Sequence, residues 1–117
     1  RFAPELGSDG KSRIVDRKTG RVWELPALQD NGRTDEDYIL VTRLTASESG
    51  QGVLVVAGLT QYGTQAAGEI VTNRALLSRA LSGVNSGWWE RNLQLLFHVR
   101  VVNHTPGPPR LLATHDW

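Results

Sequence analysis

The residues with the clearest chemical potential form a glycine-bracketed loop, Gly58-Leu-Thr-Gln-Tyr-Gly-Thr64. The loop follows the apolar run Val53–Ala57 and precedes a stretch of small residues that is typical of a helix. A strand that leads through such a loop into a helix can present unpaired N–H groups to an anion. Our candidate ligand-binding residues are therefore Gly58, Thr60, Gln61, Tyr62, Gly63 and Thr64. The structural alternative is that the glycines serve only a tight turn and close helix–sheet packing.

The loop does not match the common phosphate-binding signatures. It lacks the Gly-Lys-Ser/Thr ending of a Walker loop, and its glycines stand at Gly58, Gly63 and Gly68 rather than as Gly-x-Gly-x-x-Gly. Gly63-Thr64 resembles part of the Gly-Gly-x-Gly-Thr-x-x-Glu signature of nucleotide-processing, lysine-decarboxylase-like proteins, but Ala67 stands where its glutamate belongs. We therefore expect no catalytic residue, and we keep a nucleotide-like ligand sensor or an enzyme that uses this loop as the alternative.

Other residue clusters point to no known chemistry. His98, His104 and His115 have no recognised metal-ligand spacing, and we interpret the acidic run Asp35-Glu36-Asp37 as a solvated segment. The chain has no cysteine and no serine in a Gly-x-Ser-x-Gly elbow. These observations predict that the protein holds neither a metal nor a cofactor.

Tryptophans are the candidate partner-binding residues. Trp88 and Trp89 lie in a segment that favours a short helical turn, with indoles that either pack on the core or form a ligand platform or a partner anchor. We add Trp117, near the end of the chain, to the same candidate set.

Composition limits the function classes. The 117 residues suffice for one domain, and the net charge of +1 comes from scattered side chains that give no basic face for nucleic acid. No apolar run approaches the roughly 20 residues of a membrane span, so we expect a cytoplasmic protein. The chain contains no methionine, which predicts that Arg1 is a processing boundary rather than the start of translation.

The first half of the chain reads mainly as strands. We expect a flexible arm over residues 1–12 and a hairpin from Arg13–Asp16 and Arg21–Leu25, closed by Gly20. The segments 38–46 and 53–57 should pair antiparallel, because the turn between them is too short for a crossover helix. The second of these lacks polar alternation, which predicts a central strand buried on both faces.

The second half adds helices and two more strands. We predict helices over 64–71 and 74–81, the second capped by Asn73, and a short turn around the paired tryptophans. Residues 93–102 form a long strand, and its odd-numbered side chains should share one apolar face. The prolines of 105–109 separate it from a final strand over 110–117, with which we expect it to pair as a hairpin.

Several stretches together resemble a known family: Asp37–Leu44, Val53–Asn73 and Asn92–Val102, the last followed by Thr-Pro-Gly-Pro-Pro. They are similar to an uncharacterised bacterial domain, frequent in acidobacterial proteins, that lies C-terminal to DNA-binding or other signalling modules. The resemblance covers roughly residues 37–117. It implies a Rossmann-like α/β layer and a sensing or effector-binding role. It also implies a further upstream strand, without which a sheet edge would await another chain or another part of the same protein.

Our prediction is thus one α/β domain over 13–117, a part of a larger parent domain. Its Rossmann-like mixed sheet, of two or three layers, has a strand–glycine loop–helix unit at its centre and hairpins at both ends. The predicted function is a non-catalytic binding or assembly module that contacts a protein partner, with a small anionic ligand at Gly58–Thr64 as a possible addition. The expected partner is a protein or a missing part of the same protein, and not nucleic acid.

Overall fold

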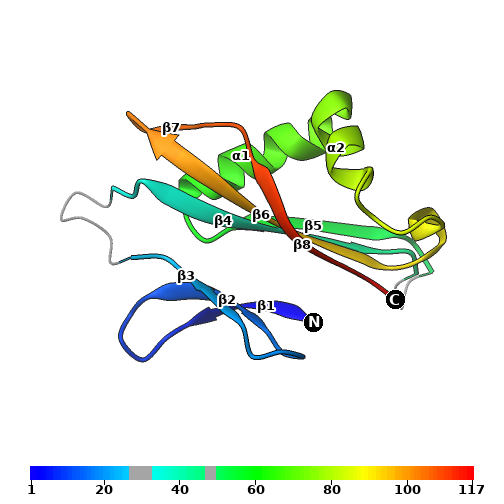
Figure 1. The fold of residues 1–117 in the computed structure, drawn as a ribbon, viewed down its shortest axis with the longest axis horizontal. Helices are drawn as coiled ribbons and strands as arrows, with labels where there is room; N and C mark the ends of the chain where they lie inside the picture. Colours follow the sequence, from blue (N-terminus) through cyan, green and yellow to red (C-terminus); the bar gives the residue numbers. More distant parts are fainter. Residues whose placement is uncertain (27–32, 47–49) are drawn as a thin grey trace.

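Two antiparallel sheets and two α-helices make up the computed structural model, which describes residues 1–26, 33–46 and 50–117. The strands are β1 (Phe2–Leu6), β2 (Ser12–Asp16), β3 (Val22–Glu24), β4 (Glu36–Leu44), β5 (Val53–Gly58), β6 (Leu93–Val102), β7 (Thr105–Pro106) and β8 (Arg110–Asp116). The helices are α1 (Gln61–Thr72) and α2 (Arg74–Leu81), and a 3-10 turn, η1, covers Trp88–Glu90. Figure 1 shows three layers: the helices, the sheet of β4 to β8, and the small sheet of β1 to β3.

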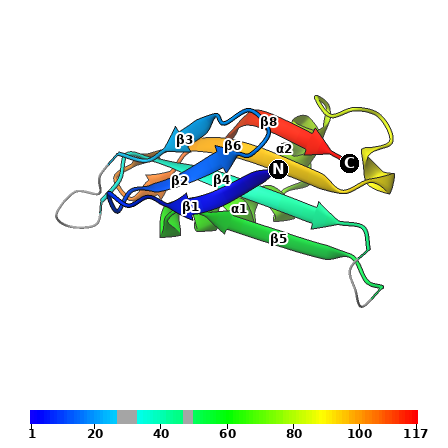
Figure 2. The ribbon, with the colours of Figure 1, turned by 90° about the horizontal axis from the view of Figure 1, so that it is seen from below.

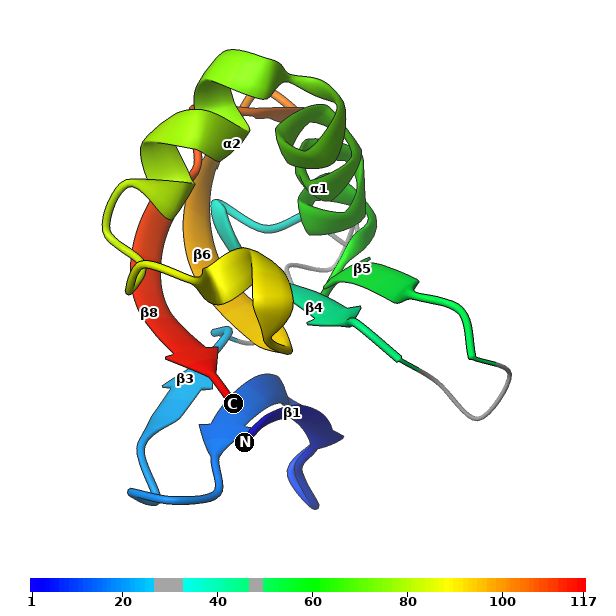
Figure 3. The same cartoon turned by 90° about the vertical axis from the view of Figure 1, so that its right-hand side faces the viewer.

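The large sheet is antiparallel throughout its described strands. Its order is β5-β4-β6-β7, and β8 also pairs with β6. The sheet curls around the helices like half a barrel (Figure 3). The Rossmann-like mixed sheet that we predicted is therefore wrong, and so is the α/β class that went with it.

The reason lies in which strands become neighbours. The predicted strand–glycine loop–helix unit is present, because β5 leads directly into α1. However, β5 and β6, the strands at either end of the helical connection, both pair with β4 and run antiparallel to it. They are therefore parallel to each other but separated by β4, whereas a Rossmann unit pairs the two strands directly.

The small sheet has order β1-β2-β3 and contains the predicted N-terminal hairpin. Gly20 closes that hairpin at φ +77°, a left-handed conformation that favours glycine. Residues 1–12, expected to be a flexible arm, instead contain β1, which pairs with β2 along its whole length. Gln94 of β6 ties β1 to the large sheet, since its amide accepts from the N–H of Phe2 at 2.9 Å and donates to the Phe2 carbonyl at 3.0 Å.

The large sheet is covered on both faces, which produces two apolar cores. The helix-side core contains Leu93, Leu95, Phe97 and Val99, four of the five odd-numbered residues predicted to share one face of β6, together with Ile39, Val41 and residues of α1 and α2. The core toward the small sheet joins Leu96 and Leu40 to residues of β1, β2 and β3. Side chains alternate between opposite faces of a strand, so β4 and β6 can supply both cores.

Strand β5 corrects a second prediction. It lies at the edge of the large sheet, pairs only with β4 among the described strands, and is largely exposed rather than buried on both faces. Leu54 and Val55 are 54% and 53% exposed. Figures 2 and 3 show that β5 extends beyond the small sheet, so the face on that side, which Val55 shares with Val53, is left uncovered.

The helical predictions are confirmed. Helix α1 includes the predicted stretch 64–71, and α2 matches the predicted 74–81. The Asn73 side chain caps α2 by accepting from the N–H groups of Ala75 and Leu76 at 3.1 and 3.2 Å. The short turn at the paired tryptophans is also present as η1.

Candidate functional site

The predicted ligand loop joins the end of β5 to the start of α1. Thr60 is the N-cap of α1, and its hydroxyl accepts from the N–H of Tyr62 at 3.2 Å. Gln61 is exposed, whereas Tyr62 and Gly63 are buried. The phenol of Tyr62 bonds with Nδ1 of His104 at 2.8 Å. The Thr64 hydroxyl donates to the Thr60 carbonyl at 3.1 Å.

A carboxylate of the protein itself occupies the N-terminus of α1. Asp37 of β4 is fully buried, and its Oδ2 accepts from the N–H groups of Thr60 and Gly63 at 2.9 and 2.7 Å. The same oxygen accepts from the Thr60 hydroxyl at 2.6 Å, and Oδ1 accepts from the N–H of Tyr38 at 2.7 Å. These donors are the ones that we expected an anionic ligand to use.

Burial and hydrogen bonding act on Asp37 in opposite directions. Burial disfavours the charged form and raises the pKa of Asp37, and this is the larger effect. The bonds from Thr60, Tyr38 and Gly63 favour the carboxylate and partly offset the rise. Asp37 is therefore an internal acceptor that fixes β4 to the β5–α1 loop. Our interpretation of Asp35-Glu36-Asp37 as a solvated segment was therefore wrong for Asp37.

The two loop glycines lie against each other. A Cβ added at Gly58 would lie 2.3 Å from the backbone carbon of Gly63 and from the backbone nitrogen of Thr64. A Cβ added at Gly63 would lie 2.3 Å from Oδ2 of Asp37. Since carbon atoms normally pack near 3.5–4.0 Å, only glycine fits at either position. Close packing of β5 on α1 thus accounts for both glycines, and ligand binding at Gly58–Thr64 stays a prediction.

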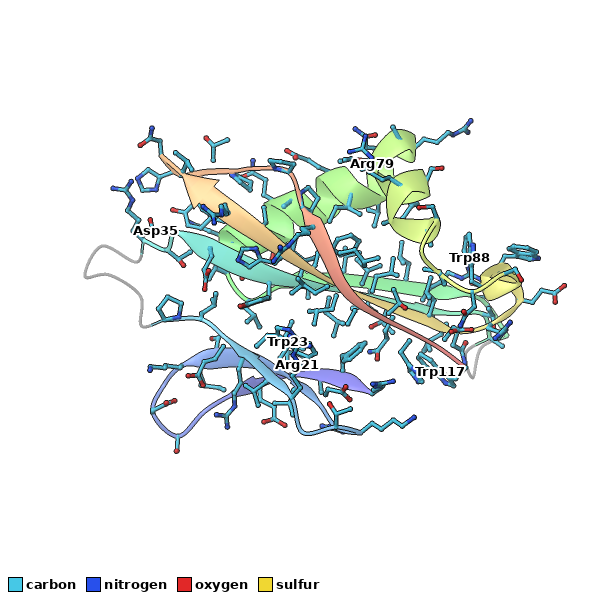
Figure 4. All side chains as sticks on the ribbon, viewed as in Figure 1. Arg21, Trp23, Asp35, Arg79, Trp88 and Trp117 are labelled. Carbon is cyan, nitrogen blue, oxygen red and sulfur yellow. The ribbon has the colours of Figure 1, made fainter. Side chains whose placement is uncertain are left out.

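The three candidate tryptophans have different surroundings. Trp88 is half-buried against the helix-side core, with the Arg43 guanidinium 5.1 Å from its ring centre. Trp89 is 58% exposed. Trp117 is stacked on His115 at 5.0 Å, and Figure 4 places it just after β8, below Trp88 at the same end of the molecule.

Trp89 and the start of β5 form an exposed apolar surface at the opposite end of β5 from the glycine loop. A shallow, open depression of about 390 Å³ lies between them, with Arg43, Val53, Leu54 and Trp89 among its lining residues. Arg43 holds this corner together by donating to the carbonyl of Trp89 at 2.5 Å. We use the name β5 edge for Val53, Leu54, Val55 and Trp89. We did not predict this surface, because we predicted that β5 is buried. An apolar run in the sequence has the same pattern whether it lies in a core or at an interface.

The remaining candidate clusters are dispersed. Glu36 bonds with Nε2 of His98 at 3.2 Å, while Asp37 turns inward. Within residues 1–26, 33–46 and 50–117, no group of three His, Cys, Asp or Glu side chains is placed to hold a metal ion.

Comparisons with protein families, curated proteins and solved structures give no match for this chain. The resemblance to the bacterial signalling-associated domain therefore stays a prediction. In the described part of the chain, no helix has the length and apolar character that crossing a bilayer requires.

Proposed function

We propose that this chain is a non-catalytic assembly module that binds a protein partner along the β5 edge. The carrying observation is an edge strand of Val, Leu, Val, Val, Ala and Gly with no charged residue and no proline. Its outer backbone groups can hydrogen-bond an added strand, and its exposed side chains can pack on that strand.

The other sheet edges of the described structure make this strand stand out. Edge strand β1 carries Pro4 and Glu5, edge strand β3 has three residues and ends in Glu24, and β7 has only two residues, one of them Pro106. Strand β8 carries charges at Arg110 and Asp116. Charges, prolines and short strands are the usual devices that prevent pairing with other chains. Their absence from β5 supports a strand that is kept open for a partner.

The depression beside Trp89 supports the same surface. An exposed tryptophan next to a shallow recess of about 390 Å³ can pack against an apolar side chain of the partner, as the aromatic anchors of interfaces do. Backbone pairing along β5 would then provide affinity, and the recess would provide selectivity.

A ligand at Gly58–Thr64 ranks below this proposal. The donors of that loop already bind Asp37, so an external anion would have to displace a buried carboxylate. A sensor or an enzyme that uses this loop would likewise have to displace the Asp37 carboxylate from the loop donors. The resemblance to a domain of signalling proteins and the expected cytoplasmic location are compatible with an assembly role and await their own tests.

The proposal is tested by purifying the native assembly from its source, identifying the chains by intact mass, and following amide hydrogen exchange in β5. We expect a stoichiometric protein chain whose binding slows exchange along β5. The substitution Val55→Lys should weaken that binding at least about tenfold, because it places a charge on the paired edge.

The matched control is Val102→Lys. Val102 is also an exposed strand valine, at 66% exposure, but it lies at the end of β6 rather than on β5. It should leave the partner affinity unchanged. A second copy of this chain as the partner would support the proposal. A lone monomer with freely exchanging β5 amides, or equal loss in both variants, would overturn it.

A further inference from the structure

The backbone of β5 alternates between groups that pair with β4 and groups that point outward. The N–H of Leu59, one residue beyond β5, donates to the carbonyl of Tyr38 at 3.1 Å and continues the ladder between β4 and β5. Hydrogen-bonded residues alternate along an antiparallel pair, so the odd-numbered residues of β5 also bond to β4. The backbone groups of the even-numbered residues, Leu54, Val56 and Gly58, therefore point away from β4, toward the open edge of the sheet.

The chain itself closes one end of this open edge. The N–H of Gly58 donates to the hydroxyl of Thr64 in α1 at 3.3 Å. In the described part of the chain, no strand lies on the outer side of Leu54 and Val56. Each of these two residues therefore offers its N–H and its C=O to a partner strand.

A second copy of β5 fits these groups in an antiparallel register. With Val55 on a two-fold axis, Leu54 lies opposite Val56 of the second copy, and the two residues exchange both backbone hydrogen bonds. The outward groups of Leu54 and Val56 are then paired in both copies. A register centred on Val56 would instead need the N–H of Gly58, which α1 already holds. A register centred on Leu54 would place Val56 opposite Gly52, before the strand begins.

Side chains and charge favour a partner strand of the same kind. Val53, Val55 and Ala57 are exposed on one face of β5, opposite the face on which Val56 packs against the helix-side core. In the symmetric register, these exposed side chains from both copies form one apolar stripe. Because β5 has no charged residue, two copies meet without repulsion, and a charged peptide would find no counter-charge on the strand.

The side of α1 next to this edge continues the uncharged surface. Thr64 lies on that side, because its hydroxyl accepts from the N–H of Gly58. Val71 follows seven residues later, on the same side of the helix, and is half-buried. Arg43, near the start of β5, is held within the chain, since its guanidinium donates to the carbonyl of Trp89. A second copy can therefore approach β5 without burying an unpaired charge of α1 at these positions.

We propose that the partner of the β5 edge is a second copy of this chain, joined by antiparallel β5–β5 pairing about a two-fold axis at Val55. The large sheets of the two copies then form one continuous sheet. This inference rests on the proposed function, because it names the occupant of the same edge.

Sedimentation equilibrium of the full chain at increasing concentration tests the self-association. We expect the mass to rise from that of one chain to that of two, because a two-fold interface closes on itself. Val55→Lys should weaken the dimer at least about tenfold, since it places like charges directly opposite each other at the axis. The control Val102→Lys changes an exposed valine at the end of β6 and should leave the dimer unchanged.

Single cysteines test the register, because the chain contains no cysteine of its own. Val55→Cys places two thiols opposite each other, with Cβ atoms about 4.5–5.5 Å apart, close enough for a disulfide after a small adjustment. Val53→Cys lies on the same face but two residues from the axis in each copy, so its thiols are about 13 Å apart along the strands. With oxidised glutathione, the covalent dimer should form at least about tenfold faster from Val55→Cys than from Val53→Cys. Intact mass without reductant measures both rates.

The outcomes distinguish this inference from the proposed function. A chain that stays monomeric at millimolar concentration, but purifies with a different protein bound along β5, would overturn self-pairing and leave the proposed function in place. Equal rates of cross-linking from the two cysteine variants would overturn the register at Val55. A monomer without any partner would overturn both proposals.

Discussion

Gly58→Ala is expected to lower the free energy of unfolding by about 3 kcal/mol, near the upper end of the usual cost of overpacking. The added methyl would lie 2.3 Å from two backbone atoms, the carbon of Gly63 and the nitrogen of Thr64. Backbone cannot rotate away as a flexible side chain can, so β5 and the start of α1 must separate. Urea denaturation followed by circular dichroism measures the change.

Gly68→Ala is the matched control for this prediction. Gly68 lies within α1, and a Cβ there would meet nothing within 4 Å. Alanine favours helix over glycine, so this variant should be more stable by about 0.5–1 kcal/mol. The same chemical change would then have opposite signs at two glycines ten residues apart. A similar small effect at both positions would show that the β5–α1 contact is looser than its geometry indicates.

Local sequence patterns predicted most of the elements of this fold. Gly20 marked the first hairpin, Asn73 marked the start of α2, and alternation in β6 placed Leu93, Leu95, Phe97 and Val99 in one core. These signals come from residues a few positions apart, and they depend on backbone sterics and capping. These local signals do not depend on tertiary contacts, and they can therefore be recognised in the sequence alone.

The arrangement of the strands was not available from the same signals. The pattern strand, glycine loop, helix predicts that β5 leads into α1, but it does not state that β4 lies between β5 and β6. That position depends on contacts between residues far apart in the sequence, such as the pairing of Leu40 with Leu96, 56 positions later. The Rossmann-like prediction failed at this step because a common local motif was extended to a long-range arrangement.

The candidate site was predicted in its location but not in its chemistry. The glycine loop does lie at a helix N-terminus, yet its N–H groups bind Asp37, an acid 21 positions before Gly58. A buried acceptor that caps a distant helix leaves no periodic signal, because only its spatial neighbours define its role. The exposure of β5 was not predicted for a related reason. A hydrophobic sequence indicates that a strand is buried, but it does not indicate whether this chain or another chain buries it.

Asp37→Ala is expected to lower the free energy of unfolding by about 3 kcal/mol, because it leaves buried donors without an acceptor. The affected donors are the N–H groups of Thr60, Gly63 and Tyr38 and the hydroxyl of Thr60. Asp37→Asn keeps one acceptor oxygen at nearly the same volume and should cost about 1 kcal/mol. Equal costs for the two variants would show that the donors do not depend on this side chain. Denaturant unfolding at neutral pH measures both.

The stability of the protein should also depend on pH through Asp37. Burial raises the pKa of Asp37 above the value of about 3.9 for an exposed aspartate. Between these two values the folded state holds a proton that the unfolded state has lost, so stability falls as pH rises through this window. Asn cannot titrate, which makes Asp37→Asn the reference. The wild-type chain should therefore exceed Asp37→Asn in unfolding free energy by more at pH 4 than at pH 7. An advantage that instead grows toward pH 7 would mean that the helix N-terminus and its donors outweigh burial, and that the carboxylate is the favoured form in the folded protein.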